Sequence, residues 1–138
     1  MSGTAPDGGL YVPEKLPHFE PDALMQIDTI SNLAEHLMGP FFEGSTLKNQ
    51  LQEICDEAFS FPVRLQVIEN TARESLSVLE LFHGPTAAFK DFGARFLAAC
   101  MTRTIGSRQD GALPVTVVVA TSGDTGSAVA AAFHRRPG

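Results

Sequence analysis

The sequence is poor in basic residues, contains two cysteines and has no long apolar run. Ten Lys and Arg stand against sixteen Asp and Glu, and the net charge of −6 argues against a protein that wraps nucleic acid or coats an anionic membrane. No apolar run approaches the roughly 18 residues of a membrane span, and no basic stretch followed by an apolar one opens the chain. We therefore expect a cytoplasmic protein with no nucleic-acid or membrane partner.

The cysteines and histidines of the sequence do not form the patterns of a disulfide or a metal site. Cys55 and Cys100 lie far apart, outside any Cys-x-x-Cys arrangement, and each falls within an apolar helical pattern. The four histidines are scattered without the spacing of metal ligands. The sequence therefore predicts two buried thiols and no metal site.

The composition is that of a globular chain, and the length is that of about one domain. Its 138 residues are 43% hydrophobic and 19% charged, which disfavours a disordered tail or a coiled coil. Residues 1–89 hold 4 basic and 13 acidic residues, whereas residues 90–138 hold 6 and 3. The second part could host an anion, although a solvated acidic surface on the first part explains the asymmetry equally well.

Hydrophobic periodicity predicts the elements and the fold class. In order, we expect an extended strap over 1–20, helices over 21–38 and 47–61, strands over 63–67 and 76–81, a helix over 87–105, a strand over 114–120 and a helix over 127–133. The β-branched run at 114–120 is typical of a strand buried on both faces of a parallel sheet. This order predicts an α/β fold, in which a small N-terminal helical domain with its strap and first strand (1–72) precedes the beginning of a sheet domain (73–138). Because such a sheet needs more crossovers, we expect the chain to be a piece of a longer protein.

Lys90 is the first candidate functional residue. It stands between Phe89 and Phe92 at the start of a predicted helix, in a partly desolvated position near the positive end of the helix dipole. A lysine in that setting can act as a nucleophile toward an aldehyde. The alternative is a lysine whose stem packs on apolar neighbours while its amine reaches water. We expect the adjacent Asp91 and Arg95, one helical turn apart, to form an ordinary surface ion pair.

The segment Thr-Ser-Gly-Asp-Thr-Gly at 121–126 falls between the predicted buried strand and the last helix. Backbone N–H groups at a helix N-terminus, with the hydroxyls of Ser122 and Thr125, would form a cradle for an anion. The alternative is a tight turn in which Asp124 or Thr125 is the N-cap. The segment lacks the spacing of either nucleotide-binding glycine motif, which argues against nucleotide phosphate.

Residues 80–92, Glu-Leu-Phe-His-Gly-Pro-Thr-Ala-Ala-Phe-Lys-Asp-Phe, closely resemble the lysine segment of the threonine synthases, which are pyridoxal-phosphate enzymes. The strap at 7–13 and the segment 121–126 are also similar to that family, and the resemblance spans nearly the whole chain. It implies that residues 73–138 begin a pyridoxal-phosphate lyase-type catalytic domain with a parallel or mixed sheet. The loop that binds the cofactor phosphate would then lie beyond Gly138.

The same resemblance implies a role for each candidate. Lys90 would carry pyridoxal 5'-phosphate covalently and move protons of the substrate, with Phe89 and Asp124 as further cofactor contacts. The residues that would bind the substrate are Thr121, Ser122 and Thr125. The complete enzyme would convert O-phospho-L-homoserine and water to L-threonine and phosphate. Alternatives are a related pyridoxal-phosphate enzyme, such as a threonine dehydratase or a cysteate synthase, and a non-catalytic homologue that acts as a binding module.

Overall fold

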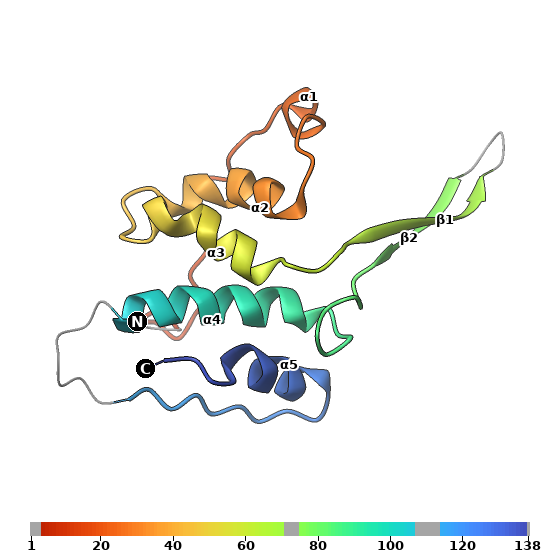
Figure 1. Cartoon of the computed structure of the whole chain (residues 1–138). Coiled ribbons are helices and arrows are strands. Elements are labelled where there is room, and N and C mark those ends of the chain that lie inside the picture. Colours follow the sequence, from red (N-terminus) through yellow and green to blue (C-terminus); the bar gives the residue numbers. More distant parts are fainter. Residues whose placement is uncertain (1–3, 71–74, 107–113, 138) are drawn as a thin grey trace.

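The structure, a computed structural model, describes residues 4–70, 75–106 and 114–137. Stacked helices form its body, and one hairpin projects from them (Figure 1). The elements in chain order are α1 (Pro21–Leu24), α2 (Ile30–Met38), the 3-10 turns η1 (Gly39–Phe42) and η2 (Lys48–Gln50), α3 (Leu51–Ala58), β1 (Arg64–Asn70), β2 (Ser75–Glu80), α4 (Lys90–Gly106) and α5 (Asp124–Phe133). The predicted domain boundary after residue 72 lies outside the described residues.

The first predicted helix is divided in two. Pro21 opens α1, as expected of a proline at the first position of a helix. Helix α1 ends at Leu24, and the chain is extended at Thr29, whose side-chain oxygen accepts a hydrogen bond from the N–H of Asn32 at 3.1 Å. Because an N-cap threonine favours a new helix start, α2 begins at the next residue and the prediction of one continuous helix is wrong.

The second predicted helix starts later than its sequence pattern indicates. The hydroxyl of Ser45 accepts a hydrogen bond from the N–H of Leu47 at 3.2 Å, and the chain passes through the 3-10 turn η2 before α3 begins. Helix α3 buries one apolar face, as the periodicity behind its prediction requires. The residues buried on that face are Leu51, Ile54, Cys55 and Ala58.

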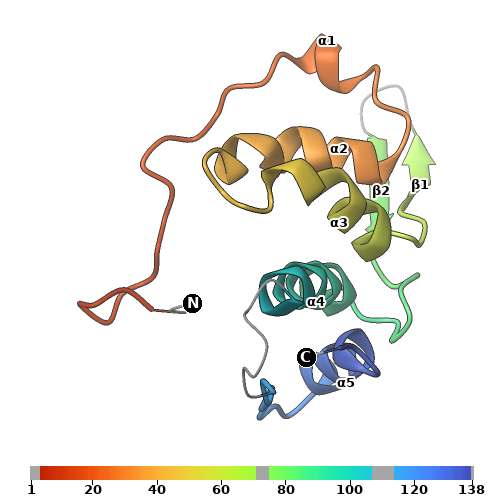
Figure 2. The ribbon, with the colours of Figure 1, turned by 60° about the vertical axis from the view of Figure 1, so that its left-hand side comes forward.

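The core lies between three helical layers. Helix α3 packs on one side of α4 and α5 packs on the other, with α2 outside α3 (Figure 2). The buried side chains of α4 and α5 are small, which lets the helix backbones approach each other closely. The alanines buried in these two helices are Ala98, Ala99, Ala128 and Ala132.

Arg95 joins α4 to the end of α3. Its guanidinium donates hydrogen bonds to the backbone oxygens of Ala58 at 2.8 Å and Glu57 at 2.6 Å, and to the hydroxyl of Ser60 at 2.9 Å. These bonds use carbonyls that the end of a helix leaves without partners. The predicted surface ion pair between Arg95 and Asp91 is therefore wrong, since Arg95 caps α3 and Asp91 is buried.

Strands β1 and β2 pair antiparallel, with Arg64 opposite Glu80 and an irregularity between Val67 and Glu69. The two strands occur close to the positions that periodicity predicts. The hairpin projects away from the helices (Figure 1), and its apolar side chains are exposed on both strands. The exposed apolar residues of the hairpin are Leu65, Val67, Ile68, Leu76, Val78 and Leu79.

Residues 114–120 run extended beside α5 (Figure 1) but form no ladder with any described strand. The prediction of a strand buried in a parallel sheet is therefore wrong for the described part of the chain, where Val118 is 87% exposed. A strand becomes buried only when neighbours pair with it, and β1 and β2 pair with each other. Helix α5 also begins at Asp124, three residues before the predicted start.

Candidate active site

The structure brings Lys90 and Asp124 together. Helices α4 and α5 lie side by side with their N-termini at the same end (Figure 1), and each contributes its first residue. The Nζ atom of Lys90 lies 2.8 Å from Oδ1 and 3.1 Å from Oδ2 of Asp124, and 4.1 Å from the ring centroid of Phe89. The side chains of Lys90 and Asp124 are 32% and 48% exposed, so a ligand can reach both. The three residues predicted to contact the cofactor, Lys90, Phe89 and Asp124, therefore lie next to one another.

The surroundings of Asp124 favour its ionised form. The hydrogen bond from Lys90 holds the pKa of this carboxyl below its usual value. Slight desolvation works in the opposite direction, while the charge of Lys90 and the backbone N–H groups of Asp124 and Thr125 lower the pKa further. A carboxylate at the first position of a helix also meets the positive end of the helix dipole. At neutral pH the carboxylate is thus an acceptor aimed at the Lys90 amine.

The segment 121–126 consists of a tight turn at 121–123 and the first residues of α5. The hydroxyl of Thr121 accepts a hydrogen bond from the N–H of Gly123 at 3.2 Å. The methyl group of Thr121 lies so close to Gly126 that a Cβ there would collide with it. Of the other predicted substrate residues, Ser122 is exposed and Thr125 is half-buried next to Asp124.

The N-cap of α5 is Gly123, not Asp124 or Thr125. The alternative in which one of those side chains caps the helix is therefore wrong. Asp124 is the first helical residue, and its carboxylate is directed to Lys90. This contact joins two helices through residues that lie 34 apart in sequence. The anion cradle stays a prediction.

One polar contact at the site was missed in the sequence. Asp91, which follows Lys90, is buried and accepts two hydrogen bonds from Thr86 in the turn before α4. Periodicity places Asp91 on a helix surface and carries no information about that turn. The available signal was Gly84, because a residue without a side chain permits a close approach of Asp91.

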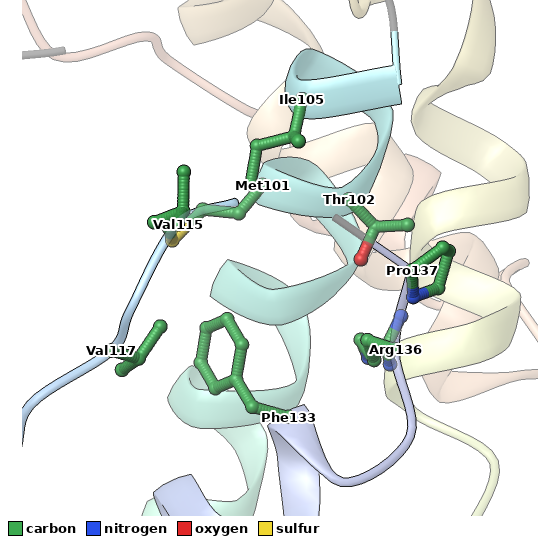
Figure 3. A pocket seen from close by; sticks show the side chains of 8 residues that line it. All are labelled: Met101, Thr102, Ile105, Val115, Val117, Phe133, Arg136 and Pro137. Atoms are coloured by element: carbon green, nitrogen blue, oxygen red, sulfur yellow. The ribbon is translucent and has the colours of Figure 1, made fainter. Parts of the chain in front are cut away.

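A cavity of about 230 Å³ lies toward the C-terminal end of α4, away from Lys90 (Figure 3). Figure 3 shows Phe133 reaching toward Val117 and Arg136 closing the opposite wall. The lining residues are Met101, Thr102, Ile105, Val115, Val117, Phe133, Arg136 and Pro137. The cavity shares no residue with the predicted site and does not define it.

The donor set of the site determines what it can hold. Within the described ranges, no group of three or more His, Cys, Asp or Glu side chains is arranged to bind a metal ion. The site instead offers a primary amine and a carboxylate beside an aromatic ring. An amine can form a covalent bond with an aldehyde, and a carboxylate can accept a strong hydrogen bond from a hydroxyl. These groups fit an aromatic aldehyde that carries a ring hydroxyl.

Comparison with known proteins shows the relatives of the chain. The family model described as "Threonine synthase N terminus" matches residues 1–59. The chain is 39% identical to threonine synthase of Escherichia coli K12, over 98% of this chain and 30% of that protein. It is 45% identical to "Threonine synthase-like 2" of Pongo abelii, over 93% of this chain and 27% of that protein. The chain thus spans about 30% of the length of the curated relatives it matches.

Solved structures give the same result for the fold. The crystal structure of threonine synthase from Escherichia coli matches 98% of this chain with a TM-score of 0.81 and 38% identity, and the match covers 30% of that structure. Threonine synthase from yeast matches 97% with a TM-score of 0.81 and 32% identity, over 29% of that structure. A pyridoxal-phosphate-bound threonine synthase from Brucella melitensis matches 98% with a TM-score of 0.74 and 35% identity, again over 29%.

The chain therefore has the mixed helix and strand fold of the N-terminal portion of these proteins, which confirms the predicted fold class. It corresponds to the N-terminal portion of threonine synthases, as its resemblance to their lysine segment indicated. No helix within the described residues has both the length and the apolar character that a membrane crossing requires.

Proposed function

We propose that the protein carrying this chain is a pyridoxal-phosphate-dependent threonine synthase, a lyase-type enzyme that converts O-phospho-L-homoserine and water to L-threonine and phosphate. The contact of Lys90 with Asp124 at the paired N-termini of α4 and α5 is the observation that carries the proposal. The pyridoxal-phosphate-bound relative supports the choice of cofactor. In this proposal the 138 residues supply the lysine side of the site and are inactive alone.

Each site residue receives one role in the proposal. The amine of Lys90 binds the cofactor aldehyde and later moves protons at the α, β and γ carbons of the substrate. The carboxylate of Asp124 accepts a hydrogen bond from the ring hydroxyl, and the exposed ring of Phe89 flanks the cofactor. Three hydroxyl-bearing residues in the turn before α5 and at its start hold the substrate carboxylate and neighbouring polar groups: Thr121, Ser122 and Thr125.

The geometry supports this division of roles. The cofactor supplies an electron sink for negative charge that develops on the substrate. The N-terminal ends of α4 and α5 provide positive electrostatic potential where an anionic substrate would enter. Lys90 lies within hydrogen-bond distance of Asp124, so a proton held at Nζ has a stabilising anion beside it.

Activity of the full-length protein tests the proposal. Purified protein supplied with pyridoxal phosphate and O-phospho-L-homoserine should release phosphate and form L-threonine in equal amounts. Lys90→Arg keeps a cation near Asp124 but cannot form the bond to the aldehyde under these conditions, so we expect turnover to be lost. Lys15→Ala, which removes an exposed lysine of the strap, is the matched control and should leave turnover unchanged.

The product separates the proposal from its alternatives. Formation of a 2-oxo acid instead of threonine would assign the same lysine to a different pyridoxal-phosphate reaction. A folded protein that takes up no cofactor would favour a non-catalytic binding module. Threonine formation that persists in Lys90→Arg would show that the catalytic lysine is wrongly assigned.

A further inference from the structure

Asp91 is a buried carboxylate whose two oxygens both accept hydrogen bonds from one residue, Thr86. Asp91 is 1% exposed, and no other charged side chain among the described residues is buried. Oδ2 accepts the backbone N–H of Thr86 at 2.9 Å, and Oδ1 accepts the hydroxyl of Thr86 at 2.8 Å. Burying a carboxylate is costly unless hydrogen bonds compensate, and here the compensation comes from the turn that leads into α4.

The turn needs this support because its backbone is constrained. Ala87 has a φ of 55°, in the left-handed region that alanine adopts at a cost in free energy. Its N–H donates to the oxygen of Gly84 at 3.1 Å. Gly84 itself lies against Asp91, since a Cβ added there would stand 2.5 Å from Oδ2. Asp91 therefore contacts both ends of a constrained turn.

This turn ends at Lys90, the first residue of α4. Thr86 and Asp91 bracket the segment that contains Phe89 and Lys90, so their two hydrogen bonds fix the direction in which α4 begins. The Lys90 amine then spans the gap to Asp124 on α5. A rotation of the first helical turn would move the amine away from that partner.

We propose that Thr86 and Asp91 are positioning residues, which hold the start of α4 so that the Lys90 amine meets the Asp124 carboxylate. Neither residue touches Lys90 Nζ in this role, and both act through the backbone of the turn. The structural part of the proposal depends on geometry alone. Its consequence for turnover rests on the proposed function.

The test compares substitutions that differ by one hydroxyl in the full-length protein. Thr86→Val removes the hydroxyl donor and keeps the shape of the side chain, and Thr86→Ser keeps the donor. Thr102→Val is the matched control, because it removes a threonine hydroxyl of α4 that donates to the oxygen of Ala98 at 2.9 Å, far from the turn. If Thr86→Val does not fold, Thr86→Ala compared with Thr86→Ser makes the same comparison.

The first readout is the pKa of Asp124, measured by NMR titration of labelled aspartate in cofactor-free protein. Thr86→Val should raise this pKa toward the usual value, because the hydrogen bond from Lys90 that lowers it is weakened. Thr86→Ser and Thr102→Val should leave the pKa at its parental value. An Asp124 pKa that is the same in Thr86→Val and Thr102→Val overturns the proposal.

The second readout is turnover of O-phospho-L-homoserine. A misplacement of about 1 Å at a reacting group can cost on the order of 100-fold in rate, and we expect a fall in kcat of that order for Thr86→Val, with a smaller change in KM. Thr86→Ser should recover kcat. If the parent protein forms no threonine, the proposed function fails, while the Asp124 titration still supports or overturns the positioning role.

Discussion

At the scale of single residues, the thiol of Cys55 is buried and inaccessible to solvent. It is fully buried in the face of α3 that packs into the core, and burial raises its pKa to about 12. Nearby acidic groups, Glu35 and Asp56, act in the same direction. Because the thiolate is the reactive form, this cysteine has almost none of it at neutral pH.

We therefore predict that Cys55 resists alkylation by iodoacetamide at pH 8 in native protein and reacts readily in urea. Cys100 is half-buried, and burial also raises its pKa, so it should be labelled slowly but before Cys55. Mass spectrometry of the two cysteine peptides measures both rates. Rapid labelling of Cys55 in the native state would show that the core around α3 opens.

Substitution of Thr125 distinguishes a role in ligand binding from a role in helix stability. It is half-buried in the first turn of α5, whose N-cap is Gly123, so its hydroxyl is not needed for capping. If Thr125 donates to the substrate carboxylate, Thr125→Val should weaken apparent affinity by roughly 1.5–3 kcal/mol, as for other hydrogen bonds to charged groups, with little change in Tm.

Steady-state kinetics and thermal melts on the same full-length variants check this prediction. Ser127→Ala is the matched control in the same helical turn, since its hydroxyl donates to the backbone oxygen of Asp124 at 2.9 Å and faces no proposed ligand. Asp124→Ala should instead change the visible spectrum of the cofactor-loaded protein. A lower Tm with unchanged kinetics in Thr125→Val would assign that residue a structural role.

At the scale of elements, Glu57 joins α3 to α4 and to the segment after α5. Its carboxylate accepts a hydrogen bond from Arg103 at 2.8 Å and another from Arg136. Burial works to raise the pKa of Glu57, and these two arginines more than offset it, so the pKa is held below its usual value. A group with a lowered native pKa stabilises the fold above its unfolded pKa and loses that contribution as pH falls.

We predict that Glu57→Gln lowers the free energy of unfolding by about 1 kcal/mol at pH 7, the scale of a part-exposed ion pair. The difference from the parent should shrink as pH falls below the usual glutamate pKa of about 4.3, because the parent also loses the charge. Urea unfolding at several pH values measures it. Glu53→Gln is the control, since Glu53 is exposed and lies 3.9 Å from Arg103. A pH-independent difference would contradict the ion-pair explanation.

The elements also show what the sequence could predict. The apolar face of α3 and the start of α1 at Pro21 follow from local periodicity and from the fixed φ of proline, and both are confirmed. The break at Thr29 also has a local cause, but apolar residues continue in phase across it and conceal it. Burial of the strands could not be predicted, because a strand is buried only by neighbours that a local pattern does not identify.

Some features of the candidate site could likewise be predicted from local sequence, and others depend on how the helices pack. Lys90 and the segment 121–126 stand out by residue type and by their place at predicted helix starts. The contact between Lys90 and Asp124 depends on the parallel packing of α4 and α5, which no spacing in the sequence specifies. Asp91 was misassigned because a buried carboxylate and an exposed one have the same periodicity, and only its contacts with Thr86 distinguish them.

At the scale of the whole molecule, large apolar side chains are exposed on several segments of the described chain. The hairpin exposes apolar side chains on both strands, and residues 114–120 present unpaired backbone with Val118 exposed. Unpaired strand edges and exposed apolar residues favour association between chains. In the solved relatives these 138 residues correspond to about 30% of a longer chain.

We predict that the 138-residue chain expressed alone aggregates at micromolar concentration. Val118→Lys places a charge on the exposed extended segment and should increase the monomeric fraction. Ser122→Lys, at an exposed position in the adjacent turn, controls for the added charge. Size-exclusion chromatography with light scattering measures the outcome. A monomeric parent chain that unfolds cooperatively would contradict the prediction and favour a self-contained module.

The most direct test of the central claim is the chemical location of the cofactor. The chain contains three lysines, Lys15, Lys48 and Lys90, which peptide mapping resolves. Full-length protein incubated with pyridoxal phosphate should develop a visible absorption band that borohydride removes, fixing the cofactor to the protein. We predict that the fixed cofactor is found on the peptide that contains Lys90 and is absent from those of Lys15 and Lys48. Cofactor fixed at any other lysine of the protein, or no fixed cofactor at all, would contradict the assignment of Lys90.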